Sequence, residues 1–387
     1  MSAAWPSSCA RRKTPGLPAS SLRLTWASAM SDSFKIASSA GEYAVRIGST
    51  DAVRADTIVL CDQFFAPAYQ AQGLKVIGIE ATEAAKSLDR MGDIIVAMRE
   101  FGANRKTHVL AVGGGVIQDI ATFVTSIYMR GLQWDYVPTT LLGMVDSCIG
   151  GKSSINVGAY KNLVGNFYPP QTVVIDMKFA ATLNTEQRVA GLCEAVKICF
   201  AHTGSAFDDY LAMNPQPHDA PEQLRDVIRL SLMTKRWFIE IDEHDKKERL
   251  LLNYGHTFGH AIESACDFVI PHGIAVGIGV LASLHFARLN QHYPTPPQRV
   301  QQMEAYMTRL LANLPQLPGW IPQVLVADLM RRFEADKKHS ASHYAVIVPD
   351  AQGQLVRLEL PKTDASRTML QQAFEAALQQ AATCGAA

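Results

Sequence analysis

Short apolar runs alternate with longer helical or glycine-containing stretches over the first half of the chain. The runs are rich in β-branched residues and lie at 56–62, 75–80, 108–112, 134–138 and 172–176, with another just after Met30. Short strands separated by helical segments are typical of a parallel sheet that is covered on both faces. We therefore predict an α/β domain at the N-terminal end.

The apolar period becomes that of helices after about residue 186. Helices are expected at 222–243, 258–290, 298–312 and 364–380, and a late strand pair at 344–348 and 355–360 is joined by a turn at Gly353. We predict three parts: an extension at 1–29, a Rossmann-like α/β domain at 30–185 and a mainly helical domain at 186–387. Ligands commonly bind between such domains and at the carboxyl ends of the strands.

Composition excludes several classes of function. The formal net charge is zero, so a general attraction to nucleic acid or to an anionic membrane has no support. No run approaches the eighteen apolar residues that span a bilayer. The seven cysteines are odd in number, scattered and without C-x-x-C spacing, which favours reduced thiols in a cytoplasmic protein.

The first 29 residues differ from the rest of the chain. They are basic, contain several Ser and Pro, and have no acidic residue before Asp32. An organellar transit peptide would fit this composition, but a disordered extension upstream of a structured start at Met30 fits it better. A secretory signal is disfavoured because the segment has no continuous apolar region.

Three glycines, Gly113 to Gly115, follow the strand expected at 108–112. Such a turn lets the backbone approach a phosphate and points the free N–H groups of the next helix at an anion. The full dinucleotide fingerprint is not present, because Gln118 stands where its last glycine would be. A tight turn that needs positive φ is the alternative. Asp62 ends an earlier strand and suits either a ribose hydroxyl or an ordinary turn.

A polar, glycine-containing segment occupies 138–162 and has neither helical nor strand periodicity. A segment of this length inside a compact domain is often functional. It contains Lys152, Lys161 and Asn162, and lysine is a compact point charge that suits anions. We therefore expect a site for a phosphorylated or carboxylated substrate, with solvated loop lysines as the alternative.

Helix 222–243 places a lysine on its apolar face. The apolar stripe consists of Leu224, Val227, Ile228 and Leu232. Lys235 falls about three turns after Leu224, on the same inward face, where a lysine either extends to solvent or has a function. Arg249 follows, with a guanidinium able to bind a carboxylate through two hydrogen bonds. Lys337 and Lys338 are most simply surface charge.

Three histidines, His256, His260 and His272, lie close together in the sequence. His256 and His260 share a helix face whether or not a metal is present. Glu194 lies in a hydrophobic helical segment, where a carboxylate is costly without a partner. Two histidines and one glutamate are an open ligand set of a catalytic zinc, so the sequence predicts a metal site.

These motifs, in this order, resemble those of the 3-dehydroquinate synthase family of sugar-phosphate cyclases. The resemblance extends from about residue 57 to 350. It rests on G-G-G-V-I-Q-D (113–119), P-T-T-L-L (138–142), V-D-S (145–147), G-G-K (150–152), K-N (161–162), G-L-C-E-A-V-K (191–197), L-N-Y-G-H-T-F-G-H-A-I-E (252–263), H-G-I-A-V (272–276) and D-K-K (336–338). The segment E-A-A-K, with Glu83 and Lys86, belongs to the same set.

The resemblance implies two cofactors, NAD and a zinc or cobalt ion. The metal ligands would be Glu194, His256 and His272. The residues assigned to NAD are Asp62, Glu83, Lys86, Gly114, Gly115, Asp119, Thr139, Thr140, Lys161 and Thr182.

The implied substrate is a phosphorylated seven-carbon sugar. The residues assigned to it are Asp146, Lys152, Asn162, Lys197, Lys235, Arg249, Asn253, His260 and Lys338. Arg130 matches a position that reaches the neighbouring subunit's site in the family, which implies a homodimer.

The implied activity is that of a lyase in the shikimate pathway, which converts 3-deoxy-D-arabino-heptulosonate 7-phosphate to 3-dehydroquinate and phosphate. NAD⁺ would oxidise a ring hydroxyl that the metal polarises, phosphate would leave, and NADH would return its hydride. Ring opening and an intramolecular aldol closure would complete the carbocycle.

Several positions depart from the family pattern. Ile274 replaces a glutamate, Gln118 replaces a glycine, and S-S-I-N-V-G-A-Y replaces T-G-I-N-H-P-L-G at 153–160. These departures leave open a paralogous cyclase that acts on sedoheptulose 7-phosphate or an amino analogue, although such relatives tend to change the retained Arg249. A metal-dependent polyol dehydrogenase would release NADH and would need no lysine-rich site. A non-catalytic binding protein should have lost several of the assigned residues.

Overall fold

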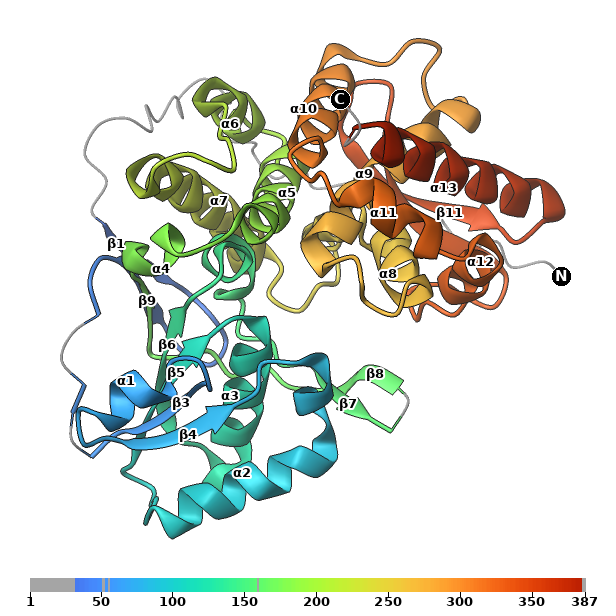
Figure 1. Cartoon of the computed structure of the whole chain (residues 1–387). Coiled ribbons are helices and arrows are strands. Elements are labelled where there is room, and N and C mark those ends of the chain that lie inside the picture. The colour runs from blue at the N-terminus through green and yellow to red at the C-terminus, as the bar shows by residue number, and fades with distance from the viewer. Residues whose placement is uncertain (1–31, 51–52, 55, 159, 385–387) are drawn as a thin grey trace, which may run out of the picture. The chain divides into compact units, whose positions relative to one another are not determined.

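A seven-stranded sheet organises the first half of the protein, in a computed structural model that describes residues 32–384 apart from 51, 52, 55 and 159 (Figure 1). Its strands are β1 (Ser33–Ile36), β2 (Tyr43–Ile47), β3 (Ile58–Asp62), β4 (Lys75–Ile79), β5 (His108–Gly113), β6 (Gln133–Pro138) and β9 (Thr172–Ile175). Their order is β1-β2-β9-β6-β5-β3-β4, and only the pair β1–β2 at the edge is antiparallel. The predicted parallel sheet is confirmed. The extension expected at 1–29 lies outside the described residues.

Both faces of the central strands are covered. Residues 58–61 of β3 and 109–113 of β5 are buried one after another, and side chains of a strand alternate between its faces. Helix α3 (Gly115–Ile127) contacts β3, β5 and β6, while α1 (Ala66–Gln70) contacts β3 and β4. Helix α2 (Leu88–Glu100) packs against β4 and α3, and its first turn is capped by the Ser87 hydroxyl.

The carboxyl ends of the strands form one edge of the sheet. Asp62 ends β3, Gly113 ends β5, and Gly113 is paired in register with Pro138 at the end of β6. The N–H of Thr139 donates to the Gly113 carbonyl at 3.0 Å, which keeps the two strand ends together. Parallel sheets bind their ligands at this edge.

The second half of the described chain is mainly helical. Its helices are α4 (Met177–Ala181), α5 (Thr185–Ala201), α6 (Ala206–Met213), α7 (Pro221–Ile241), α8 (His256–Ala265), α9 (His272–Leu289), α10 (Gln298–Leu311), α11 (Leu317–Trp320), α12 (Val326–Glu334) and α13 (Asp364–Cys384). The hairpin of β10 (His343–Pro349) and β11 (Leu355–Pro361) was also predicted, with its turn at Gly353. Residues from Ser33 onward group as one unit, so the boundary expected near residue 185 stays a prediction.

Helix α9 is the core helix of this half. It has no unbroken run of eighteen apolar residues, yet its length and mean hydropathy would allow it to cross a membrane. Inside the protein 78% of it is buried, where it contacts α5, α8 and α13. Glycines allow the close approach. A Cβ on Gly279 would overlap the Gly255 carbonyl at the start of α8, and a Cβ on Gly273 would overlap the Ala190 carbonyl of α5. The three helices that carry Glu194, His256 and His272 are thereby held in backbone contact.

One prediction about local structure was wrong, and one segment without a clear period in the sequence is ordered. The helix expected over 258–290 is two helices, because Asp267 and Phe268 have φ of +46° and +65° and an α-helix cannot continue through them. The helical spacing of apolar residues continues across the break because α8 and α9 both bury apolar side chains in the same core. The segment 138–162 contains a π-helix, η3 (Gly143–Ser147), and a hairpin of β7 (Ile155–Val157) and β8 (Tyr160–Val164). Strand β8 is largely exposed, so it has no apolar alternation.

Four short 3₁₀ helices complete the described structure. They are η1 (Glu83–Lys86), η2 (Tyr128–Arg130), η4 (Glu248–Asn253) and η5 (Ile321–Gln323). The first three of them carry residues that the family resemblance assigned to the site: Glu83 and Lys86, Arg130, and Arg249 and Asn253.

The close packing of α8 on α9 predicts the effect of adding one methyl group. Gly279→Ala should lower the free energy of unfolding by about 1–3 kcal/mol, because backbone atoms surround the new Cβ and cannot move aside as a flexible side chain could. Gly92→Ala is the matched control: Gly92 is an exposed position of α2 with no atom within 4 Å of a new Cβ, so this variant should gain up to about 1 kcal/mol. Urea denaturation measures both. Equal midpoints for the two variants would contradict the packing argument.

Candidate active site

Glu194 and two histidines meet where α5, α8 and α9 come together. His256 is the first residue of α8, His272 is the first residue of α9, and Glu194 is fully buried within α5. The Glu194 Oε1 atom lies 3.6 Å from His256 Nε2 and 3.4 Å from His272 Nε2. His260, one turn after His256, adds a third imidazole, and one ring nitrogen from each histidine lies within 4.8 Å of the others.

This arrangement fits a metal ion. Ligand atoms about 2.1 Å from a tetrahedral zinc lie roughly 3.4 Å from one another, close to the two distances from Glu194. The other nitrogen of each ring has an acceptor: His256 Nδ1 lies 3.3 Å from the Tyr254 carbonyl, and His272 Nδ1 lies 3.2 Å from Glu263 Oε2. Metal-bound histidines usually make such bonds, which leave Nε2 free for the metal. Glu263 was not predicted from the sequence as a site residue, although it ends the H-A-I-E segment of the motif.

The electrostatics of this trio keep Glu194 ionised. Burial favours the protonated acid, but Lys197 and His272 outweigh it and hold the pKa of Glu194 well below its usual range. Burial lowers the pKa of His272, yet its hydrogen bonds to Glu194 and Glu263 raise that pKa to about 10. For His256, burial and the nearby positive charge of Lys197 place the pKa far below the ordinary value, so this imidazole is neutral. His256 and Glu194 are thus in the forms that bind metals, while His272 holds a proton between two carboxylates that a metal ion would displace on binding.

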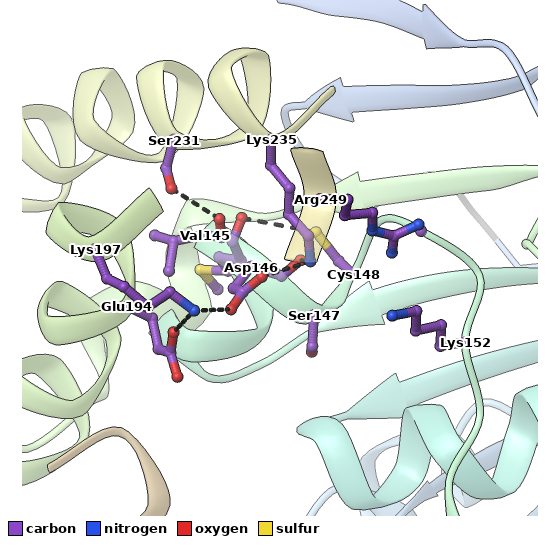
Figure 2. Close-up of polar contacts among 12 residues, drawn as sticks. Val145, Asp146, Ser147, Cys148, Lys152, Glu194, Lys197, Ser231, Lys235 and Arg249 are labelled. Carbon is purple, nitrogen blue, oxygen red and sulfur yellow. Dashed lines mark hydrogen bonds and ion pairs between the residues drawn. The ribbon is translucent and has the colours of Figure 1, made fainter. Parts of the chain in front are cut away.

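A cluster of lysines around Asp146 adjoins the trio (Figure 2). Lys197 forms ion pairs with Glu194 and with Asp146 Oδ2, the latter at 3.7 Å. Lys235 Nζ donates to Asp146 Oδ1 at 2.5 Å and to the Asp146 carbonyl at 2.6 Å. Both lysines are buried, as the sequence predicted for Lys235. Burial lowers the pKa of Lys197, but Glu194 and Asp146 raise it above the ordinary value, so the ammonium stays charged.

Arg249 and Lys152 share a carboxylate that was not predicted from the sequence. Arg249 is 3% exposed, and its Nε lies 2.9 Å from Asp245 Oδ1. Lys152 also forms an ion pair with Asp245. The loop is fixed by Asp242, whose carboxylate accepts the backbone N–H groups of Lys246, Lys247 and Arg249. The sequence did contain a signal for Asp245, the run D-E-H-D at 242–245. Acidic side chains beside a predicted anion site would repel the anion unless nearby cations pair with them.

Asn253 and Lys338 line a cavity of about 350 Å³. Its other lining residues are Asp245, Lys246, Leu250, Thr257, Ala345, Ile347 and Arg357. Lys338 is not the plain surface charge that its sequence context favoured: its Nζ lies 2.8 Å from Asp336, and its side chain is largely covered. The cavity therefore joins residues of η4 and α8 to the β10–β11 hairpin.

A second group of predicted residues surrounds Lys86. Its Nζ lies 2.8 Å from Asp119, 3.6 Å from Glu83 and 3.3 Å from Asn162 Oδ1. Lys161 lies 4.0 Å from Glu83. Burial raises the pKa of Asp119 to about 6, against the opposing effect of Lys86. The structure thus brings together residues that the resemblance assigned to NAD and Asn162, which it assigned to the substrate.

Asn156 belongs to this second group and was not predicted from the sequence. It donates to Glu83 Oε1 at 2.9 Å and accepts the Asn162 N–H at 2.8 Å. Asn162 itself has a φ of +50°, so this bond holds an unusual backbone conformation.

Packing requires the first two of the three glycines at the end of β5, whereas Gly115 has open space around a new Cβ. Gly113, Gly114 and Gly115 all lack positive φ, so the tight-turn alternative was wrong. A Cβ on Gly113 would overlap Ile117, and a Cβ on Gly114 would lie 3.0 Å from Thr140 Cγ2. The backbone at the start of α3 is therefore pressed against the segment after β6, which carries Thr139 and Thr140.

Three assigned residues lie apart from these ion-pair networks in the described structure. Asp62 Oδ1 accepts the Phe64 N–H at 3.0 Å, as an ordinary turn aspartate does. Thr182 caps α4 and donates to the Phe179 carbonyl at 2.8 Å. Arg130 is exposed and joins none of the ion pairs above, although it lies in a strained turn where φ is positive at Met129, Arg130 and Gly131.

Comparison with known proteins gives one family. The model of the 3-dehydroquinate synthase N-terminal region matches residues 76–190, and that of the C-terminal region matches residues 191–339. The 3-dehydroquinate synthase of Latilactobacillus sakei is 34% identical over 318 residues, which are 80% of this chain and 86% of that protein. The Xylella fastidiosa enzyme is 35% identical over 315 residues, which are 75% and 82% of the two chains.

The fold is also that of solved cyclases. A crystal structure of 2-deoxy-scyllo-inosose synthase complexed with carbaglucose-6-phosphate, NAD⁺ and Co²⁺ matches with a TM-score of 0.76 at 23% identity, over 89% of this chain and 99% of that one. The motifs, the fold and the family models agree over most of the described residues. The chain belongs to the 3-dehydroquinate synthase family.

Proposed function

We propose that this protein is a 3-dehydroquinate synthase, which converts 3-deoxy-D-arabino-heptulosonate 7-phosphate to 3-dehydroquinate and phosphate and uses NAD and a zinc or cobalt ion. One observation supports this most strongly: Lys197 pairs with both Glu194 and Asp146, and so joins the candidate metal ligands to the lysine cluster. A carbocycle-forming elimination needs both groups in one site, because it oxidises an alcohol and then expels phosphate.

The metal would be held by Glu194, His256 and His272, and when bound it would polarise a substrate oxygen as a Lewis acid. NAD would be held at the carboxyl edge of the sheet, by the backbone of α3 and by the group around Lys86, and when bound it would accept a hydride and return it. The related 2-deoxy-scyllo-inosose synthase, which was solved with NAD⁺ and Co²⁺, supports both cofactors.

The buried lysines would stabilise the negative charge that develops on the substrate. Lys197 and Lys235 have little water around them, so their attraction for an enolate oxygen or a leaving phosphate is stronger than it would be at the surface. Asp146 forms ion pairs with both lysines and would hold the two ammonium groups in place before the substrate arrives.

The anionic ends of the substrate would be bound by Arg249, Lys152, Asn253 and Lys338. Asp245 pairs with both Arg249 and Lys152 and leaves one positive charge in excess, and a substrate carboxylate or phosphate would take over part of this pairing. His260 would bind the substrate beside the metal ligands. We also propose a homodimer in which Arg130 reaches the neighbouring subunit's site, and a cytoplasmic enzyme, in line with the free thiols of the described cysteines.

An activity panel tests the proposed reaction. Purified protein with NAD⁺ and Zn²⁺ is offered 3-deoxy-D-arabino-heptulosonate 7-phosphate and sedoheptulose 7-phosphate. We expect phosphate and cyclic product from the first sugar, with no accumulation of NADH absorbance, because the hydride returns within each turnover. Faster turnover of sedoheptulose 7-phosphate would indicate a paralogous cyclase, and stoichiometric NADH release would indicate a polyol dehydrogenase.

The metal assignment predicts different behaviour for two neighbouring histidines. His256→Ala should lose bound zinc and all turnover, since it removes one of three proposed protein ligands. His260→Ala should keep its zinc and bind the substrate more weakly. Elemental analysis of the dialysed proteins measures the metal. Full zinc in the His256 variant, or loss of zinc from the His260 variant alone, would refute the ligand set.

The carboxylate of the proposed substrate predicts a strict need for arginine at position 249. Arg249→Lys keeps the charge but loses the planar fork, and charge-assisted hydrogen bonds contribute about 1.5–3 kcal/mol. We therefore expect kcat/KM to fall tenfold or more on the heptulosonate substrate. Arg236→Lys, at an exposed i,i+4 pair with Glu240 on α7, is the control and should change kcat/KM little. An unchanged kcat/KM for Arg249→Lys would contradict its role.

A further inference from the structure

The π-helix η3, which carries Asp146, is held by side chains from two other helices. Three successive carbonyls at its end, those of Val145, Asp146 and Ser147, each accept a hydrogen bond from outside it. Ser231 Oγ of α7 donates to Val145 at 2.9 Å, and Lys235 of the same helix donates to Asp146 (Figure 2). The last carbonyls of a helix lack partners within it, so these donors decide whether the turn is stable.

The third donor is Gln118, which is 5% exposed on the first turns of α3. Its Nε2 donates to the Ser147 carbonyl at 2.6 Å, and its Oε1 accepts from the Ser147 hydroxyl at 2.7 Å. Both the nitrogen and the oxygen of the Gln118 amide therefore bond to Ser147, the residue that follows Asp146. Within the described chain, Gln118 is the residue of α3 whose side chain makes hydrogen bonds to η3.

A π-helix is rarely stable without such support. Its backbone bond from Cys148 N to the Gly143 carbonyl, at 3.1 Å, spans five residues and is less favourable than the ordinary α-helical bond. Relaxation to an α-helical turn would rotate Asp146 relative to α5 and α7. The Asp146 carboxylate would then move away from Lys197 and Lys235, and the two ammonium groups would lose the ion pairs that hold them in place.

We propose that Gln118 is a positioning residue: through Ser147 it fixes the π-helical turn and so sets where Asp146 holds Lys197 and Lys235. The residue acts from α3, the helix to which NAD binding is assigned, on the lysine cluster of the other half of the chain. The kinetic part of this inference rests on the proposed function, while its structural part does not.

Gln118→Leu tests the inference, because leucine fills a similar volume but can neither donate nor accept. We expect kcat to fall roughly ten- to a hundredfold, as misplacement of a reacting group by about 1 Å does. The dissociation constant of NAD should change less than about twofold, since the backbone of α3 is untouched. A crystal structure of the variant should show η3 as an α-helical turn, with Asp146 more than about 4 Å from Lys235 Nζ.

Thr125→Val is the matched control. Thr125 is also buried on α3, but its hydroxyl donates only within that helix, to the Ala121 and Thr122 carbonyls. This variant should lose a comparable amount of stability and keep kcat within about twofold. A loss of kcat in both variants would mean that general damage to α3, and not the bond to Ser147, is responsible.

Gln118→Glu keeps the test valid if the leucine variant does not fold. The glutamate has the shape of the amide, and in its ionised form it can accept from the Ser147 hydroxyl but cannot donate to the Ser147 carbonyl. Because burial raises the pKa of a carboxyl group, this variant is measured at alkaline pH, where the carboxylate form is favoured. It should therefore also lose kcat and the π-helical turn. An intact η3 in either variant that folds overturns the inference even if the protein proves inactive on every sugar tested, so its failure is distinct from failure of the proposed reaction.

Discussion

The buried carboxylate of Glu194 is the constraint on which the rest of the site depends. An ion taken out of water costs several kcal/mol, and this cost must be offset by opposite charge and hydrogen bonds nearby. Lys197 supplies the charge one turn away on the same helix, and His256 and His272 approach from the ends of two other helices. These approaches are possible only because glycines such as Gly273 let the backbones touch. Packing and electrostatics therefore specify the same arrangement.

The charge of Glu194 is connected to the remainder of the site through shared partners. Lys197 touches Glu194 and Asp146, and Asp146 touches Lys235. Farther along, Asp245 serves Lys152 and Arg249 together. The carboxylates of Asp146 and Asp245 thus each stabilise two cations that would otherwise repel each other. A site of this kind is preorganised for an anionic substrate, because the positive groups are already fixed and need little rearrangement when it binds.

The sequence predicted the architecture well where burial imposes a period. The parallel strands, helix α7 with its inward Lys235, and the late hairpin all follow from apolar spacing and are confirmed. The sequence also suggested Glu194 as a metal ligand, because a charge within a hydrophobic helix needs a partner. The structure places Lys197, His256 and His272 beside it. Asp245, Glu263 and Asn156 were missed since their importance lies in contacts between distant segments. The π-helix could not be predicted, because external hydrogen bonds stabilise it and it has no period of its own.

Glu194, His256 and His272 together are proposed to form a metal site, and the proposed chemistry depends on it. Anomalous diffraction at the zinc edge, from crystals grown with zinc, tests this site most directly. We expect one peak about 2.0–2.2 Å from Glu194 Oε1 and from the Nε2 atoms of His256 and His272, with His260 outside bonding distance. A peak bound by the three histidines while Glu194 stays paired only with Lys197 would contradict the proposed ligand set.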